Sequence, residues 1–251
     1  MTPLVWDDAV PRPGWQQMAI DRALAERAAS DGTCVFRLYR WERDTVSFGA
    51  NESARRTWDR ERLERLQVPC VRRPTGGRGV WHDAADLTYA VTAPLSEFGS
   101  LPVAYRLIHE QLARAIRRLG LKARLAPGSR RPTLAPGACF DIAAGGEVLV
   151  RDRKTIGSAQ ALIGGTLLQH GAIARADRSP ALARFRLASA LSDPDVSAAD
   201  LPAADLVTNA VVTTWQAEGG VVAPGELAEW AVRESAAHRG RYQDPDWTWR
   251  R

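Results

Sequence analysis

The longest stretch of the chain without a charged residue, Thr155 to Ala174, restricts what this sequence can fold into. It approaches the roughly 20 residues that a membrane-spanning helix needs. It also contains four glycines together with Gln160, Gln169 and His170. Because glycine weakens a helix and polar side chains are costly in lipid, the stretch predicts strands joined by turns, with one turn at Gly164-Gly165.

The composition fits one globular domain. The chain has 251 residues, of which 45% are hydrophobic and 25% charged, as in an ordinary folded domain with a buried core. The first residues include Asp7 and Asp8 and have no basic cluster followed by an apolar run, so no secretory signal is predicted. We expect a single cytoplasmic domain over residues 1–251, with a mainly helical C-terminal part from about residue 179.

The basic residues are almost all arginines. Lys122 and Lys154 are the only lysines among 34 basic residues, and 29 acidic residues leave a net charge of +5. The arginines alternate with acids and form no stripe, so an acidic protein partner is favoured over a nucleic acid. An ammonium can lose its proton whereas a guanidinium effectively cannot. The rarity of lysine therefore indicates that Lys154 is a candidate catalytic group. An accident of composition is the alternative.

The order of periodic segments predicts an α+β fold with helices packed on a mixed, largely antiparallel sheet. Helical spacing covers residues 15–29 and 103–119, and later helices are expected around 206–211 and 227–231. A short charged helix is expected around Trp58 to Leu66. The strand-like runs are 35–40, 45–49, 68–71, 79–82, 87–93, 147–151, 154–160 and 166–174. Residues 126–138, rich in Pro, Gly and Arg, form a long loop and hence a candidate functional loop.

A glycine-rich segment follows the run at 68–71. Gly76, Gly77 and Gly79 fall within four positions, and Arg72, Arg73 and Arg78 flank them. Glycines let a ligand approach the backbone amides, which with the arginines can hold a phosphate, a carboxylate or a thioester carbonyl. No Gly-Lys-Ser/Thr follows and strand residues come next, so the segment is neither a P-loop nor a dinucleotide fingerprint. A hairpin turn with solvated arginines is the alternative.

Cys139 follows the long loop and precedes Phe140-Asp141. An ordinary thiol, with a pKa of about 8.5, is only roughly 3% thiolate at pH 7, and a cation that lowers the pKa by about two units raises this to roughly three quarters. Placed beside Lys154, Cys139 would be an acyl-accepting nucleophile, and the amine could also move protons. A small buried hydrophobe is the alternative, and Cys34 and Cys70 are interpreted as packing residues.

Small residues on strand-like sequence form a further candidate site. Gly157 to Ala159 provide the flat wall that a bound ligand needs, and His170-Gly171 lie on the next strand-like run. Sheet packing and a structural histidine are the alternatives. His109 and His238 are expected on helix surfaces without partners. The four histidines lack metal-ligand spacing, so no metal site is expected.

Four ordered motifs carry a resemblance to a known family. They are Arg72-Arg73-Pro74-Thr75-Gly76-Gly77-Arg78-Gly79-Val80-x-His82-Asp83, Cys139-Phe140-Asp141, Arg153-Lys154-x-x-Gly157-Ser158-Ala159-Gln160 and Leu168-Gln169-His170-Gly171. Together they resemble the biotin/lipoate protein ligase catalytic-domain family from about Met18 to Ala174. The resemblance implies a seven-strand-class mixed sheet with helices around it, related to the class II aminoacyl-tRNA synthetase core.

Within the family the chain is most similar to the cysteine-dependent octanoyl-[acyl carrier protein]:protein N-octanoyltransferases. This implies an octanoyl group that passes from acyl carrier protein to Cys139, whose pKa is lowered by Lys154, and then to a lysine of a lipoyl domain such as glycine cleavage H protein, in lipoate biosynthesis. No cofactor is implied. ATP and Mg would enter only if the chain were an ATP-dependent lipoate or octanoate ligase, and a non-catalytic lipoyl-domain-binding module is the other alternative. The implied substrate-binding residues are Arg72, Arg73, Thr75, Gly76, Gly77, Arg78, Gly79, His82, Gly157, Ser158, Ala159, His170 and Gly171.

The sequence departs from similar proteins in two respects. Arg78 stands where many ligases of the family have a third consecutive glycine, and Asp86-Leu87 where they often have Asn-Leu. Residues 142–146 lack the aromatic side chains often found between the cysteine and the lysine of similar transferases. The first departure weakens the adenylate-binding alternative, and the second concerns the shape of the acyl pocket.

Overall fold

The computed structural model describes residues 2–127, 145–174, 184, 185, 187 and 201–250. Cys139 and most of the predicted loop 126–138 lie outside these residues, as does the start of the helical part expected from about residue 179. None of the helices within the described ranges is long and apolar enough to cross a membrane.

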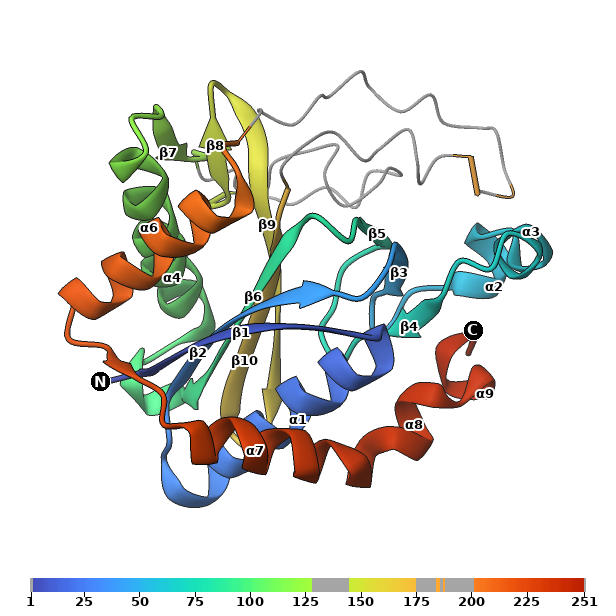
Figure 1. Ribbon diagram of the computed structural model, residues 1–251. Helices are drawn as coiled ribbons and strands as arrows, with labels where there is room; N and C mark the ends of the chain where they lie inside the picture. The colour runs from blue at the N-terminus through green and yellow to red at the C-terminus, as the bar shows by residue number, and fades with distance from the viewer. Residues whose placement is uncertain (1, 128–144, 175–183, 186, 188–200, 251) are drawn as a thin grey trace.

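The main sheet of the described part has eight strands in the order β11-β1-β2-β6-β10-β9-β8-β7 (Figure 1). β1 runs parallel to β2 and to β11, and the other neighbours are antiparallel. The predicted mixed, largely antiparallel sheet is therefore confirmed, with one strand more than the resemblance implied. The strands are β1 (Leu4–Arg12), β2 (Val35–Trp41), β6 (Leu87–Pro94), β7 (Ala123–Leu125), β8 (Val148–Val150), β9 (Arg153–Ile163), β10 (Thr166–Ile173) and β11 (Val221–Val222).

A second, three-stranded sheet carries the glycine-rich segment. Its order is β4 (Cys70–Arg72), β3 (Thr45–Phe48) and β5 (Val80–His82), with β3 parallel to β4 and antiparallel to β5. The two runs at 35–40 and 45–49 are adjacent in sequence, yet β2 pairs with β1 and β6, and β3 belongs to this smaller sheet. The glycine-rich residues connect β4 to β5 and so lie at one end of the second sheet.

Helices cover both faces of the main sheet (Figure 1). Phe36 and Leu38 of β2 pack with α4 (Leu101–Arg118) and α6 (Ala204–Ala217), whereas Tyr39 and Trp41 pack on the side of α1 (Gly14–Asp31). This alternation follows from the two-residue period of a strand. The apolar stripe that predicted a helix over 103–119 is the buried face of α4. α1 ends at Asp31 and is followed by Gly32, whose φ of 76° is the left-handed conformation that terminates helices.

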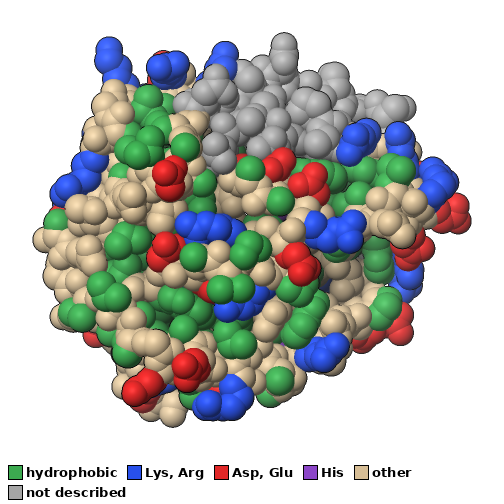
Figure 2. All heavy atoms as spheres, viewed as in Figure 1, with side chains coloured by type: hydrophobic (Ala, Val, Ile, Leu, Met, Phe, Trp, Pro, Cys, Tyr) green, Lys and Arg blue, Asp and Glu red, His purple; other side chains and the backbone are tan. Residues whose placement is uncertain are grey.

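Shorter helices complete the described chain. They are α2 (Ala54–Thr57), α3 (Arg60–Arg65), the 3-10 turns η1 (Leu95–Glu97) and η2 (Ser235–His238), and α7 (Gly225–Glu234), α8 (Arg239–Gln243) and α9 (Pro245–Thr248). α7, η2 and α8 pack against α1, and Trp249 of the C-terminal tail is buried against Phe48 and Trp58. Trp249 thus anchors the C-terminal tail on the core. Figure 2 shows basic side chains interspersed with acidic ones over one face, in line with the predicted mixed charge pattern.

Candidate active site

A pocket lies between the two sheets and α1. β9 and β10 of the main sheet form one wall, and β3 and β5 of the second sheet contribute Ser47, Val80 and His82. Met18 and Trp41 supply apolar surface. The structure brings seven of the predicted substrate-binding residues into this lining: Arg73, His82, Gly157, Ser158, Ala159, His170 and Gly171.

The wall of small residues depends on a close approach of β9 to β10. Gly157, Ser158 and Ala159 lie opposite Ala172, Gly171 and His170 in the antiparallel ladder. A Cβ added at Gly171 would collide with Ser158 Oγ and lie 2.6 Å from the carbonyl oxygen of Gly157 and 2.8 Å from the ring of Tyr89. Glycine is therefore required at position 171 for packing, and its missing side chain leaves room beside the pocket for the Ser158 hydroxyl.

Arg73 holds the glycine-rich segment through its backbone. Its guanidinium donates to the carbonyl oxygens of Ser47 at 2.8 Å, Gly76 at 2.7 Å and Arg78 at 2.7 Å. Gly77 has a φ of 91°, which favours glycine. Arg73 is 4% exposed and belongs to the pocket lining, so the alternative of a turn with solvated arginines is wrong for it.

Arg72 is fully buried and also bonds to backbone oxygens. It donates to the carbonyls of Gly49 at 2.6 Å and Glu52 at 2.9 Å, and on the C-terminal tail to Arg250 at 2.7 Å. Its guanidinium thus ties the tail to the loop after β3. Arg72 does not line the pocket, and neither do Thr75, Gly76, Gly77, Arg78 and Gly79, within the part of the chain that the structure describes.

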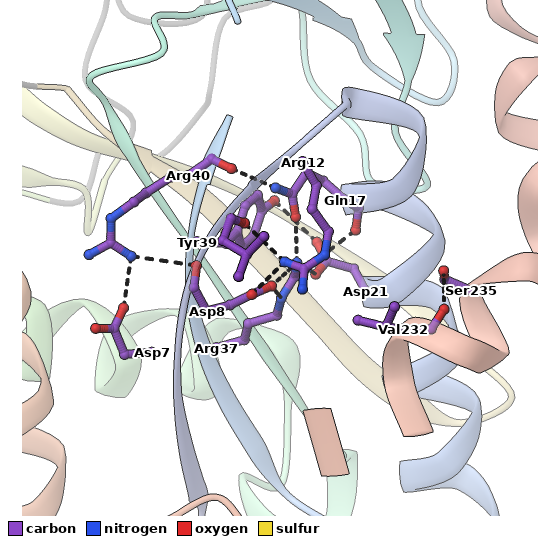
Figure 3. A network of polar contacts seen from close by, with 11 residues as sticks. Asp7, Asp8, Arg12, Gln17, Asp21, Arg37, Tyr39, Arg40, Val232 and Ser235 are labelled. Carbon is purple, nitrogen blue, oxygen red and sulfur yellow. Dashed lines mark hydrogen bonds and ion pairs between the residues drawn. The ribbon is translucent and has the colours of Figure 1, made fainter. Parts of the chain in front are cut away.

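Thr75 connects the glycine-rich segment to the main sheet through His170. The Thr75 hydroxyl lies 2.5 Å from His170 Nε2, and His170 Nδ1 donates to Asp21 at 3.2 Å. Asp21 in turn accepts from Arg37, which also pairs with Asp8 (Figure 3). These charges are buried, and buried charges are tolerated when paired. This network holds His170 in place. His170 therefore has the structural role considered as an alternative, and it also lies on the pocket wall.

His82 has one nitrogen satisfied and one without a partner. Its Nε2 lies 2.7 Å from Ser47 Oγ, and its ring stacks on Trp41 with centroids 4.0 Å apart. Burial, with further contributions from the charges of Arg73 and His170, holds the pKa of His82 well below its usual value, so the ring is neutral. Nδ1 is buried and has no hydrogen-bond partner among the residues described. This atom is the position on the pocket wall where a ligand can supply a hydrogen bond.

Lys154 is buried on β9 and forms an ion pair with Glu147, Nζ to Oε1, at 2.8 Å. Both side chains are nearly inaccessible, with 3% and 4% of their surface exposed. The ammonium is therefore held at a fixed position beside a carboxylate. Cys139, Phe140 and Asp141 lie outside the described residues, so the pairing of Cys139 with Lys154 stays a prediction.

The expectation that His109 and His238 have no partners is wrong, and the expected surface position is wrong for His109. His109 is fully buried, with Nδ1 2.7 Å from the carbonyl oxygen of Gly146 and Nε2 2.7 Å from Ser158 Oγ. His238 lies 3.0 Å from Glu26. The sequence did hold a signal for His109, because it is one turn before the buried Leu112 on the apolar stripe of α4.

Comparison with known proteins decides the family. The model of the lipoyl protein ligase A/B catalytic domain matches residues 13–183, which is more than half of the chain and includes every residue of the pocket lining. The chain belongs to this family. The recognised resemblance is therefore confirmed.

Similarity to individual proteins supports the same family assignment. An octanoyltransferase LipM of Kyrpidia tusciae is 35% identical over 93% of this chain and 94% of its own length. A LipM of Carboxydothermus hydrogenoformans is 38% identical over 64% of this chain, a match that spans 60% of that relative.

Among solved structures, a lipoate-protein ligase A bound with ATP superimposes with a TM-score of 0.79 at 21% identity, over 99% of both chains. A putative lipoate protein ligase from T. acidophilum with bound lipoic acid gives a TM-score of 0.77 at 22% identity, covering 99% of this chain and all of the other. At these identities the structures establish the shared fold.

Proposed function

We propose that this protein is an octanoyltransferase of lipoate biosynthesis, an acyltransferase that carries the octanoyl group on Cys139. The match to an octanoyltransferase over 93% of the chain carries the proposal. Other octanoyltransferases are similar at 36–39% identity. The pocket supports it because small residues and apolar side chains line it together with Arg73 and His82.

The pocket suits an acyl chain lying along β9. Gly157 and Ala159 present little side-chain bulk, and Met18 and Trp41 offer apolar contact. An apolar chain gains roughly 0.8 kcal/mol for each methylene removed from water. Arg73 and His82 are polar groups of the same lining and are available to the reacting carbonyl.

The first transfer exchanges one thioester for another. The Cys139 thiolate attacks the carbonyl carbon of octanoyl-phosphopantetheine, a carbon–sulfur bond to Cys139 forms, the bond to the pantetheine sulfur breaks, and that sulfur leaves and takes up a proton. Lys154, held by Glu147, favours the thiolate as a nearby cation. Because one thioester replaces another, the step is nearly balanced and needs no ATP.

The second transfer forms an amide. A lysine amine of the lipoyl domain attacks the acyl-Cys139 carbonyl, the carbon–nitrogen bond forms, and the Cys139 sulfur leaves and regains its proton as the amine loses one. Ser47 Oγ accepts a hydrogen bond from Arg73, so its own hydroxyl hydrogen is available to His82 Nε2. Because Nε2 then accepts, the proton of the neutral His82 ring is on Nδ1. In that arrangement His82 Nδ1 donates to the oxyanion of either transfer, an interaction worth about 3 kcal/mol in comparable sites.

The proposed partners follow from this chemistry. The donor is octanoyl-acyl carrier protein, and the acceptor is a lipoyl domain such as glycine cleavage H protein. A net charge of +5 favours encounter with an acidic carrier. No cofactor enters either step.

Intact-mass analysis after mixing the protein with octanoyl-acyl carrier protein, without ATP, tests the proposal. We expect an octanoyl adduct that hydroxylamine removes, absent from Cys139→Ala. Cys70→Ala is the matched control and should keep the adduct, because burial raises the pKa of the Cys70 thiol to about 12 and leaves it protonated. An adduct that persists in Cys139→Ala, or transfer that occurs only with ATP and pyrophosphate release, would contradict the proposal.

A further inference from the structure

A chain of buried and partly buried polar side chains links β9, β10, β6 and α4. Gln160 donates to Gln169 at 2.8 Å, and Gln169 donates to the Tyr89 hydroxyl at 2.8 Å. The Tyr89 oxygen lies 2.6 Å from Ser158 Oγ, and Ser158 Oγ lies 2.7 Å from His109 Nε2. The proposed transfer reaction uses only Ser158 from this set, as part of the pocket wall.

The direction of these hydrogen bonds fixes the tautomer of His109. At its other nitrogen, His109 Nδ1 faces the carbonyl oxygen of Gly146 at 2.7 Å, and a carbonyl can only accept. Nδ1 therefore carries the proton. Burial lowers the pKa of His109 to about 4, so the ring is neutral and Nε2 is an acceptor. The Ser158 hydroxyl donates to His109, and the Tyr89 hydroxyl donates to Ser158.

His109 thereby joins two elements that are distant in sequence. Gly146 immediately precedes Glu147, the carboxylate partner of Lys154, and Ser158 lies on the same strand as Lys154. The turn at Gly146 is also held by its amide, which donates to the carbonyl of Ala126 at 2.9 Å. A buried ion pair is stable only while its geometry is maintained, because each charge has given up its hydration.

We propose that His109 is a positioning residue that keeps the Glu147 carboxylate on the Lys154 ammonium by holding the Gly146 carbonyl. The Gly146 carbonyl that His109 holds belongs to the residue before Glu147, so loss of this hydrogen bond loosens the backbone that carries the carboxylate. The consequence for Cys139 rests on the proposed function, in which the Lys154 ammonium favours the thiolate. The effect on Lys154 itself does not depend on that function.

Two substitutions separate the two hydrogen bonds of His109. In His109→Asn, the amide nitrogen can occupy the place of Nδ1 and donate to Gly146, while the contact with Ser158 is lost. In His109→Gln, the longer amide reaches the place of Nε2 near Ser158, while the donor to Gly146 is lost. Ser158→Ala removes the hydroxyl alone and serves as a second control.

The chain offers a direct readout because Lys122 and Lys154 are its only lysines. Lys122 is exposed and Lys154 is 4% exposed, so limited acetylation with acetic anhydride followed by peptide mass spectrometry reports their relative accessibility. We expect the ratio of Lys154 to Lys122 acetylation to rise roughly five- to tenfold in His109→Gln, as loss of one buried hydrogen bond predicts for local opening. In His109→Asn and Ser158→Ala the ratio should stay within about twofold of the unsubstituted protein.

The same variants are then assayed for the initial rate of Cys139 octanoylation against pH. We expect the profile of His109→Gln to shift to higher pH and that of His109→Asn to remain in place, a split that a purely structural role would not produce. Equal Lys154 labelling in both variants would overturn the proposal. If His109→Gln does not fold, nitrogen NMR of the unsubstituted protein still tests the proposal. The proposal requires the His109 proton on Nδ1, so a proton on Nε2 would overturn it. Absence of any Cys139 adduct in the unsubstituted protein would instead refute the proposed function and leave the labelling result standing.

Discussion

Replacing Lys154 with methionine separates the structural contribution of this lysine from its proposed catalytic contribution. Methionine is of similar size but leaves the Glu147 carboxylate buried without its ammonium. Both side chains are at most 4% exposed and their charged atoms are 2.8 Å apart. Breaking such a buried pair costs about 3–5 kcal/mol, because one charge remains in a poorly hydrated environment.

The double substitution Lys154→Met with Glu147→Gln removes both charges together. A neutral pair of similar volume is often as stable as the original, so we expect most of the lost stability to return. The resulting coupling free energy between the two positions should be about 3 kcal/mol. Neither the single nor the double variant should form the octanoyl adduct on Cys139 at an appreciable rate near pH 7, since both lack the ammonium.

Urea unfolding of the four proteins of the cycle measures the stability part. With a denaturant slope of about 1–3 kcal/mol/M, the single variant should unfold at a midpoint lower by about 1 M or more. Intact-mass analysis measures the catalytic part. The reasoning is refuted if the double variant is as unstable as the single one, or if restored stability also restores octanoylation.

Two further predictions concern the pocket wall and acid stability. Gly171→Ala should lower stability by about 1–3 kcal/mol through overpacking and slow octanoyl transfer. The reason is that a Cβ at this position meets Ser158, the Gly157 backbone and Tyr89. An unchanged melting temperature together with an unchanged transfer rate would contradict this prediction. The pKa of His109 falls from 6.5 when unfolded to about 4 when folded, so only the unfolded chain takes up a proton between these values and stability is lost as the pH falls through that window. Lowering the pH from 7.5 to 5 should cost the unsubstituted protein about 2 kcal/mol more than His109→Asn in paired urea titrations, and equal losses would exclude this assignment.

Local patterns in the sequence predicted most of the elements. The apolar stripe of α4 and the glycine after α1 are local signals, and the helices and their ends lie close to where these signals placed them. β1 was not predicted, because Asp7, Asp8 and a proline interrupt its apolar pattern. Asp8 is compatible with a buried strand because Arg37, from the adjacent strand, and Arg12 pair with it.

The candidate site was predicted to different degrees. The motifs placed Gly157 to Ala159 and His170-Gly171 together, and these residues do form one wall of the pocket. The role of Arg72 could not be inferred in the same way, because the carbonyls that it holds on the C-terminal tail are about 175 residues away in sequence. The partners of His109 were missed for the same reason.

The sequence by itself determined the class of fold, the family and the residue types available for acyl transfer, since these depend on local periodicity and on ordered motifs. Only the tertiary structure decided which polar groups are satisfied and which remain available to a ligand. Lys154 is paired with Glu147, His170 is held between Thr75 and Asp21, and His82 keeps one nitrogen without a partner among the described residues. Hydrogen bonds and burial depend on three-dimensional distances between segments that are far apart in the chain, and no local pattern encodes those distances.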